Sequence, residues 1–98
     1  MIRHVVLIKP QLNLDPDLIE QARSGLEALP EQIPGIAAFA FGVNNSPEGM
    51  AKGFEIGFTI DFVDAAARDA YLPHPAHQAY IPSVGAIAAD VLVFDFEI

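Results

Sequence analysis

The sequence predicts an α+β domain whose elements follow the order β-α-β-β-α-β. In segment 54–62 apolar residues alternate with polar or small residues, and in segment 91–98 Leu92, Phe94, Phe96 and Ile98 fall on one face, as along strands. A β-branched run at 2–9 and an Ala- and Phe-containing run at 36–43 predict two further strands. Two helical segments lie between these strands. The order is that of the ferredoxin-like fold, an antiparallel four-stranded sheet with helices on one face.

The N-terminal half supplies the first strand and the first helix. His4, Val6 and Ile8 share one face of strand 2–9, and Pro10 is expected to end it. A helix is expected from about residue 16 to residue 29, because Asp-Pro-Asp at 15–17 offers a cap, a proline at the first helical position and an acid in the first turn. Prolines at 30 and 34 are expected to stop this helix.

The second strand and the loop after it form the middle of the chain. Small and aromatic residues in 36–43 predict close packing on both faces of that strand. The Asn-Asn-Ser-Pro-Glu-Gly sequence at 44–49 predicts a loop.

The C-terminal half supplies two further strands with a helical region between them. Strand 54–62 places its Phe and Ile side chains on one face. Asp64 is expected to cap a short helix at 65–72, and segment 78–89 is expected to be a broken helix interrupted by Pro82 and Gly85. Strand 91–98 then closes the sheet.

The composition predicts one domain, residues 1–98, that assembles as a homodimer. Hydrophobic residues make up 52% of 98 residues, more apolar surface than a small monomer can cover. The helices cover only one face of the sheet, so two sheets are expected to meet face to face around a two-fold axis and form a dimeric α+β barrel. A small-molecule ligand is expected inside that barrel.

The charge pattern excludes several partners. The net charge is -8, and the five Lys and Arg residues are scattered, whereas nucleic-acid binding needs a clustered basic surface. No apolar run approaches the ~20 residues of a membrane span, and the N-terminus resembles a strand more than a signal peptide. A cytoplasmic protein with no membrane partner is therefore expected. The absence of cysteine rules out thiolate chemistry.

The segment Tyr71-Leu-Pro-His74-Pro-Ala-His77 concentrates the chemically versatile side chains. It holds two of the three histidines and one of the two tyrosines of the chain. Histidine exchanges protons near neutral pH, and a tyrosine hydroxyl can polarise a carbonyl. The prolines on both sides of His74 restrict the backbone, so that the polar rings are expected on a stiff frame.

The chain resembles the stress-responsive α/β-barrel (Dabb) proteins over nearly its whole length. The resemblance rests on five segments in order: His4-Val-Val-Leu, residues 42–49, Gly53-Phe54, residues 71–77 and Leu92-Val-Phe-Asp95-Phe. It implies the dimeric barrel. Plant polyketide cyclases that form olivetolic acid are members of this family and need no metal or cofactor, which implies a cofactor-independent enzyme. Most members have no assigned reaction.

The resemblance also assigns roles within the segment. It implies that His77 and Tyr71 form a catalytic acid-base pair and that His4 lines the pocket. His74 and Phe58 are expected among the substrate-binding residues. The third-strand histidine of many members falls on Ile56 here. The implied chemistry is a cyclisation, isomerisation or lyase step on a small, largely apolar carbonyl compound.

Other interpretations of the same residues stay open. His77 and Tyr71 could serve packing and loop closure alone, and the protein could be a non-catalytic stress-response or ligand-binding oligomer. His74 and His77 are spaced as a metal pair, but a third ligand would have to come from His4, Glu55 or Asp95, so no metal is expected. A haem-handling dimer with His77 as an axial ligand is a further alternative.

Overall fold

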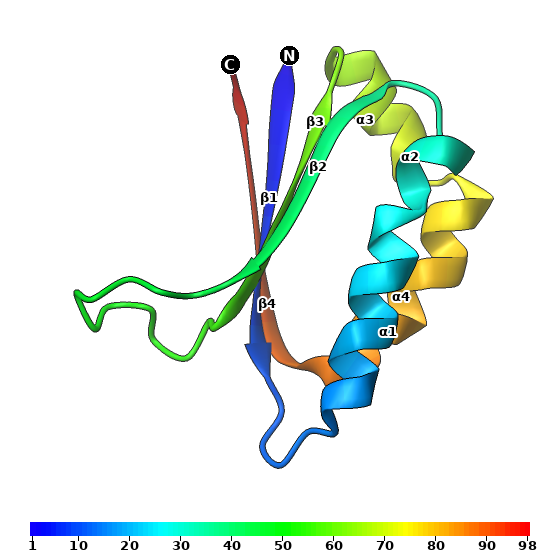
Figure 1. Ribbon diagram of the computed structural model, residues 1–98. Helices are drawn as coiled ribbons and strands as arrows, with labels where there is room; N and C mark the ends of the chain where they lie inside the picture. The colour runs from blue at the N-terminus through cyan, green and yellow to red at the C-terminus, as the bar shows by residue number, and fades with distance from the viewer.

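A computed structural model describes residues 1–98 as one sheet with helices on a single side (Figure 1). The four strands pair antiparallel in the order β2-β3-β1-β4. The predicted ferredoxin-like order is confirmed, with each helical region divided in two. The elements are β1 (Ile2–Pro10), α1 (Pro16–Glu27), α2 (Leu29–Gln32), β2 (Ile36–Val43), β3 (Ile56–Phe62), α3 (Ala65–Tyr71), α4 (Pro75–Ile87) and β4 (Ala88–Glu97).

The face of the sheet under the helices forms the core. His4, Val6 and Ile8 are buried there, as the alternation in β1 predicts. They lie in register with Ile60, Phe58 and Ile56 of β3, which are also buried. The helices, with Ile33 directly after α2, complete this core: Ala22, Leu26, Leu29, Tyr71, Tyr80 and Ile87.

No element of the chain covers the opposite face of the sheet, which we call the open face. Its side chains differ in size between the two halves of the sheet. On β2 and β3 the side chains of the open face are small, and they include Ala38, Ala40, Gly42, Gly57 and Thr59. On β1 and β4 they are bulky, and they include Leu7, Leu92, Phe94 and Phe96. The prediction that β2 packs on both faces is therefore wrong within one chain, since Phe39 and Phe41 contact the core whereas Ala38 and Ala40 are exposed.

The start of α1 is as predicted, but its end is not. Asp15 Oδ1 accepts a hydrogen bond from the backbone N–H of Asp17 at 2.9 Å, and Pro16 occupies the first turn. Pro30 does not end the helical region, because it falls in the first turn of α2, where a missing N–H costs nothing.

The prediction of a broken helix at 78–89 is wrong. Helix α4 runs without interruption through Pro82 and Gly85, and it begins earlier, at Pro75, with His74 as its cap. Packing of α4 against α1, which buries Tyr80 and Ile87, offsets the cost of an internal proline. The boundaries of two strands also shift, because β3 begins at Ile56 and β4 begins at Ala88.

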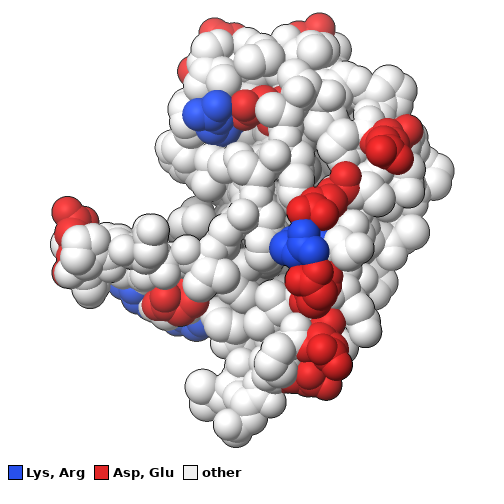
Figure 2. All heavy atoms as spheres, in the orientation of Figure 1, with Lys and Arg blue, Asp and Glu red and all other residues white.

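The surface charges are dispersed. On α1, Arg23 forms ion pairs with Glu20 and Glu27, and Figure 2 shows acidic atoms in a column broken by a single basic residue. On the face shown in Figure 2 the basic residues are isolated from one another. None of the helices has both the length and the apolar character that a bilayer crossing requires.

Candidate functional site

The sheet and α4 enclose a mainly apolar cavity of about 390 Å³. This volume lies within the range of roughly 300–1,000 Å³ that small-molecule pockets occupy. Ile81 and Val93 line the cavity and are exposed, so it opens to solvent between α4 and β4. The lining residues are His4, Val6, Phe58, Tyr71, Leu72, His77, Tyr80, Ile81, Val84, Gly85, Val91 and Val93.

The cavity gathers four of the five residues singled out in the sequence. His4 and Phe58 come from the sheet, Tyr71 from the end of α3 and His77 from α4. The fifth residue, His74, is not among the lining residues. The position of the cavity differs from the prediction of a ligand between two sheets. These side chains belong to the helix-covered face, because His4 shares its strand face with the buried Val6.

His77 and Tyr71 are in direct ring contact. Their ring centroids lie 4.1 Å apart with an angle of 34° between the planes. The Nδ1 atom of His77 lies 2.9 Å from the carbonyl oxygen of Leu72. A carbonyl oxygen only accepts hydrogen bonds, so Nδ1 carries the hydrogen and the neutral ring leaves Nε2 as its proton acceptor. The bond at Nδ1 therefore fixes the tautomer that a general base requires.

Tyr71 is a buried hydrogen-bond donor. Its side chain packs against Phe62, with ring centroids 5.0 Å apart, and against His4 at 5.9 Å. Burial raises the pKa of the Tyr71 phenol to about 12. The hydroxyl is therefore protonated at neutral pH and can donate to an electron-rich oxygen, but it cannot act as a base there.

His4 is held by a carboxylate on the neighbouring strand. Its Nδ1 atom lies 2.7 Å from Oδ1 of Asp95, and Nη1 of Arg68 donates to the other oxygen of Asp95 at 3.1 Å. The pKa of Arg68 is raised, first by its bond to Asp69 and then by Asp95. His4 therefore has a fixed ring orientation at the floor of the cavity.

His74 has a structural position at the start of α4. Its Nδ1 atom accepts a hydrogen bond from the backbone N–H of Ala76 at 3.1 Å, which is the bond of an N-cap residue. Pro75 follows it at the first helical position. The cap stabilises the first turn of α4, the helix that carries His77.

Tyr80 is a cavity residue that the sequence analysis missed. It lies three residues after His77 on α4 and lines the cavity while being only 8% exposed. Residues three apart on a helix share a face, which is the signal that could have identified it. Treating segment 78–89 as a broken helix hid that spacing.

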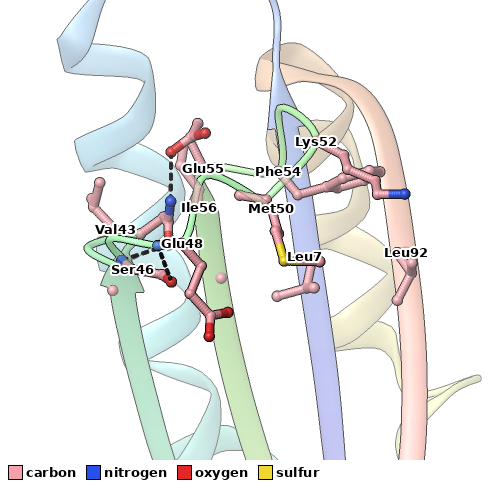
Figure 3. A pocket seen from close by; sticks show the side chains of 14 residues that line it. Leu7, Val43, Ser46, Glu48, Met50, Lys52, Phe54, Glu55, Ile56 and Leu92 are labelled. Carbon is pink, nitrogen blue, oxygen red and sulfur yellow. Dashed lines mark hydrogen bonds between the residues drawn. The ribbon is translucent and has the colours of Figure 1, made fainter.

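A second hollow, of about 590 Å³, lies beneath the 44–55 loop at the end of the open face (Figure 3). Leu7, Met50 and Leu92 are among its apolar lining residues. Asn44 closes the loop through bonds to Glu55 and to the backbone of Ser46. Neither a histidine nor a tyrosine lines this hollow, so none of the candidate residues named in the sequence analysis lies there.

Each of the three histidines has its Nδ1 atom engaged within the protein. His74 and His77 each use Nδ1 for a backbone group, and His4 uses its own for Asp95. No group of three or more His, Asp and Glu side chains is arranged to hold a metal ion. Ile56, the position onto which the family resemblance placed a histidine of other members, is buried and lines the second hollow.

The site can combine one proton acceptor with one neutral donor. Nε2 of His77 can take a proton from a ligand, and the Tyr71 hydroxyl can stabilise the negative charge that then develops on an oxygen. The mainly apolar walls lower the local dielectric constant, which strengthens both interactions. Proton transfer beside a carbonyl group is the chemistry that these groups support.

Comparison with known proteins gives consistent results over the whole chain. The family model of the stress-responsive A/B barrel domain matches residues 2–98. The stress-response A/B barrel domain-containing protein HS1 of Arabidopsis thaliana is 28% identical over 96 residues, which cover 98% of this chain and 88% of that protein.

Solved structures agree with the fold. A dimeric ferredoxin-like protein of unknown function from Jannaschia sp. CCS1 is 32% identical with a TM-score of 0.88, and the match covers 99% of this chain and 98% of the other. A hydroxynitrile lyase from Passiflora edulis has a TM-score of 0.91, with coverage of 99% and 92%. At 19% identity the second likeness concerns the fold alone.

Proposed function

Since the chain belongs to the stress-responsive A/B barrel domain family, we propose that it is a small homodimeric barrel protein that binds a small, largely apolar carbonyl-type metabolite. Within it, His77 and Tyr71 act as a cofactor-independent acid-base pair. The observation that carries this proposal is the contact between the His77 and Tyr71 rings, 4.1 Å apart, on the wall of a 390 Å³ cavity.

The proposed reaction is a proton transfer at the carbon next to a carbonyl group. Nε2 of His77 removes the proton, and the electron pair of the C–H bond moves to form an enolate. The Tyr71 hydroxyl donates to the enolate oxygen, and His77 returns the proton to the product. Cyclisation, isomerisation and lyase reactions can all begin with this step.

The homodimer is supported by the uncovered sheet face. Phe94 and Phe96 are 60% and 42% exposed, and Leu92 lies beside them. A contiguous apolar surface of this kind is typical of a protein interface. The relative from Jannaschia is described as dimeric. A second copy on this face would bury the aromatic side chains and leave the cavity under α4 accessible.

The contact between His77 and a backbone carbonyl favours a second candidate, ligand binding without turnover. A carboxylate partner would stabilise a charged imidazolium, whereas the carbonyl of Leu72 only orients the ring. In that case the protein would be a ligand-binding or stress-response oligomer that uses the same cavity. The two candidates differ in whether bound ligand undergoes proton exchange.

The test is hydrogen-deuterium exchange at the carbon next to the carbonyl of a panel of small ketones, followed by NMR in deuterated buffer. We expect the wild-type protein to accelerate exchange, His77→Ala to abolish the acceleration and Tyr71→Phe to reduce it by about 10²-fold or more. His74→Asn is the matched control, since this histidine lies outside the cavity and should leave exchange unchanged.

Two results would decide against catalysis. If His77→Ala exchanges ketone protons as fast as the wild type, the acid-base role is wrong. If ketones bind to the wild-type protein with no accelerated exchange, the binding candidate is favoured.

A further inference from the structure

The hydroxyl oxygen of Tyr80 is buried and has no hydrogen-bond partner within the protein. It is the one buried side-chain nitrogen or oxygen of the chain in this condition. Leaving a buried polar group unpaired is costly, and native proteins rarely do so without a reason. A phenylalanine at this place would fill the same space, so the hydroxyl itself requires an explanation.

The ring of Tyr80 has little freedom to turn its hydroxyl toward solvent. One edge of the ring lies against α1 at Gly25, where an added Cβ would come within 3.2 Å of Cδ2 and 3.3 Å of Cε2. The side chain as a whole is 8% exposed. The absence of a side chain on Gly25 therefore provides the space in which the ring lies, between α1 and the cavity.

Tyr80 and Tyr71 both line the cavity. The pKa of Tyr80 is raised by burial and further by Tyr71. Like Tyr71, Tyr80 is therefore a neutral donor at neutral pH. Most of the remaining wall is apolar, from residues such as Val6, Phe58 and Val84. A ligand that fits this wall would have an apolar body and an oxygen at one end.

We propose that the Tyr80 hydroxyl is a ligand-binding group that donates a hydrogen bond to an oxygen of the bound molecule, beside the hydroxyl of Tyr71. The cavity then selects compounds that present a carbonyl oxygen at the tyrosine end and an apolar body along the wall. This inference rests on the proposed function, because it concerns the ligand of the same cavity. It adds Tyr80 as a specificity-determining residue.

Binding of a matched pair of small molecules tests the proposal. Acetophenone and ethylbenzene have the same ring and the same two-carbon substituent, but only acetophenone has a carbonyl oxygen. We expect the wild-type protein to bind acetophenone more tightly, with affinities measured from amide shifts in NMR titrations. Tyr80→Phe should weaken acetophenone binding about ten-fold, the equivalent of one neutral hydrogen bond, and leave ethylbenzene binding unchanged.

The stability of the ligand-free protein supplies a second, independent readout. Removing a hydroxyl that has no partner in the fold should leave the melting temperature of Tyr80→Phe unchanged or raise it. The double variant Tyr71→Phe, Tyr80→Phe should lose less affinity than the two single losses combined, because both hydroxyls contact the same oxygen.

The outcomes separate this inference from the proposed function. If Tyr80→Phe binds acetophenone as tightly as the wild type, or melts at a lower temperature, the role of Tyr80 is refuted while the cavity keeps its proposed ligand class. If neither molecule shifts the resonances of cavity residues in the wild type, the proposed function fails and this inference fails with it.

Discussion

His4 and Asp95 face each other across the pairing of β1 and β4, with His4 Nδ1 only 2.7 Å from Asp95 Oδ1. The two residues stand 91 positions apart in the chain. This bond joins the first strand to the last on the face of the sheet that carries the cavity. Because the carboxylate occupies Nδ1, the remaining ring nitrogen of His4 is the one available to a ligand.

Asp95→Asn should lower the free energy of unfolding by about 1 kcal/mol, because it removes the charge from the bonds to His4 and Arg68. Urea denaturation measures the loss, and ¹⁵N NMR of the imidazole reports whether Nδ1 of His4 keeps its hydrogen. Asp69→Asn is the control, since Asp69 is exposed and bonds Arg68 alone. Equal losses in both variants would mean that the link to His4 adds no stability.

The two tyrosines should resist ionisation while the protein is folded. Burial raises the pKa of Tyr71 from 10.0 to about 12 and raises that of Tyr80 as well. The unfolded chain loses these protons first, so stability is complete below pH 10 and falls as the pH rises toward 12. For Tyr71 alone the loss amounts to roughly 3 kcal/mol.

Absorbance at 295 nm measures this directly, because the chain has two tyrosines and no tryptophan. We expect no tyrosinate signal at pH 10 in the folded protein and half-ionisation at that pH in urea. A folded-state midpoint near pH 10 would show that Tyr71 is not desolvated.

His74→Ala should destabilise the protein by about 1 kcal/mol without weakening ligand binding, because it removes the cap of α4. His74→Asn should restore most of the stability, since asparagine also accepts a hydrogen bond from the helix N-terminus. Thermal unfolding and an acetophenone titration give the two readouts. If His74→Asn remains as unstable as His74→Ala, the capping role is wrong.

Phe94→Glu should convert the proposed dimer to a monomer, because it places a charge among the bulky apolar side chains of the open face. Light scattering coupled to size exclusion measures the mass. Leu12→Glu is the matched control, since Leu12 is more exposed still and lies in the loop before α1. A wild-type protein that runs as a monomer would contradict the homodimer itself.

Alternation in the strands was sufficient to predict much of the fold. His4, Val6 and Ile8 share the buried face that the sequence predicts, because side chains of a strand alternate strictly between its two sides. The helices were harder to delimit. Pro30 and Pro75 lie in first turns, where proline is favoured, and Pro82 is tolerated through tertiary packing that local sequence does not encode.

The sequence analysis named several residues that line the cavity, but it expected the cavity in a different place. His77, Tyr71 and His4 meet in one cavity, but that cavity lies between the sheet and α4, not between two sheets. Alternation specifies which residues share a face, but it does not specify which face the helices cover. Tyr80 was missed because the prediction of a broken helix at 78–89 hid its helical spacing from His77, and the unpaired state of its hydroxyl oxygen is visible only in the three-dimensional structure.

The side chains of the open face project to different extents from the two halves of the sheet. Alanine and glycine at positions such as 40 and 42 project little from β2, while Phe94 and Phe96 project far from β4 at the opposite edge. In the dimer that we propose, a two-fold axis parallel to the strands would place the β4 edge of each sheet, with its phenylalanines, over the β2 edge of the other, with its small residues. A two-fold axis perpendicular to the strands, in the plane between the sheets, would instead place Phe94 and Phe96 of one copy against the same residues of the other. The sizes of the side chains on the open face therefore distinguish between these two arrangements of identical sheets.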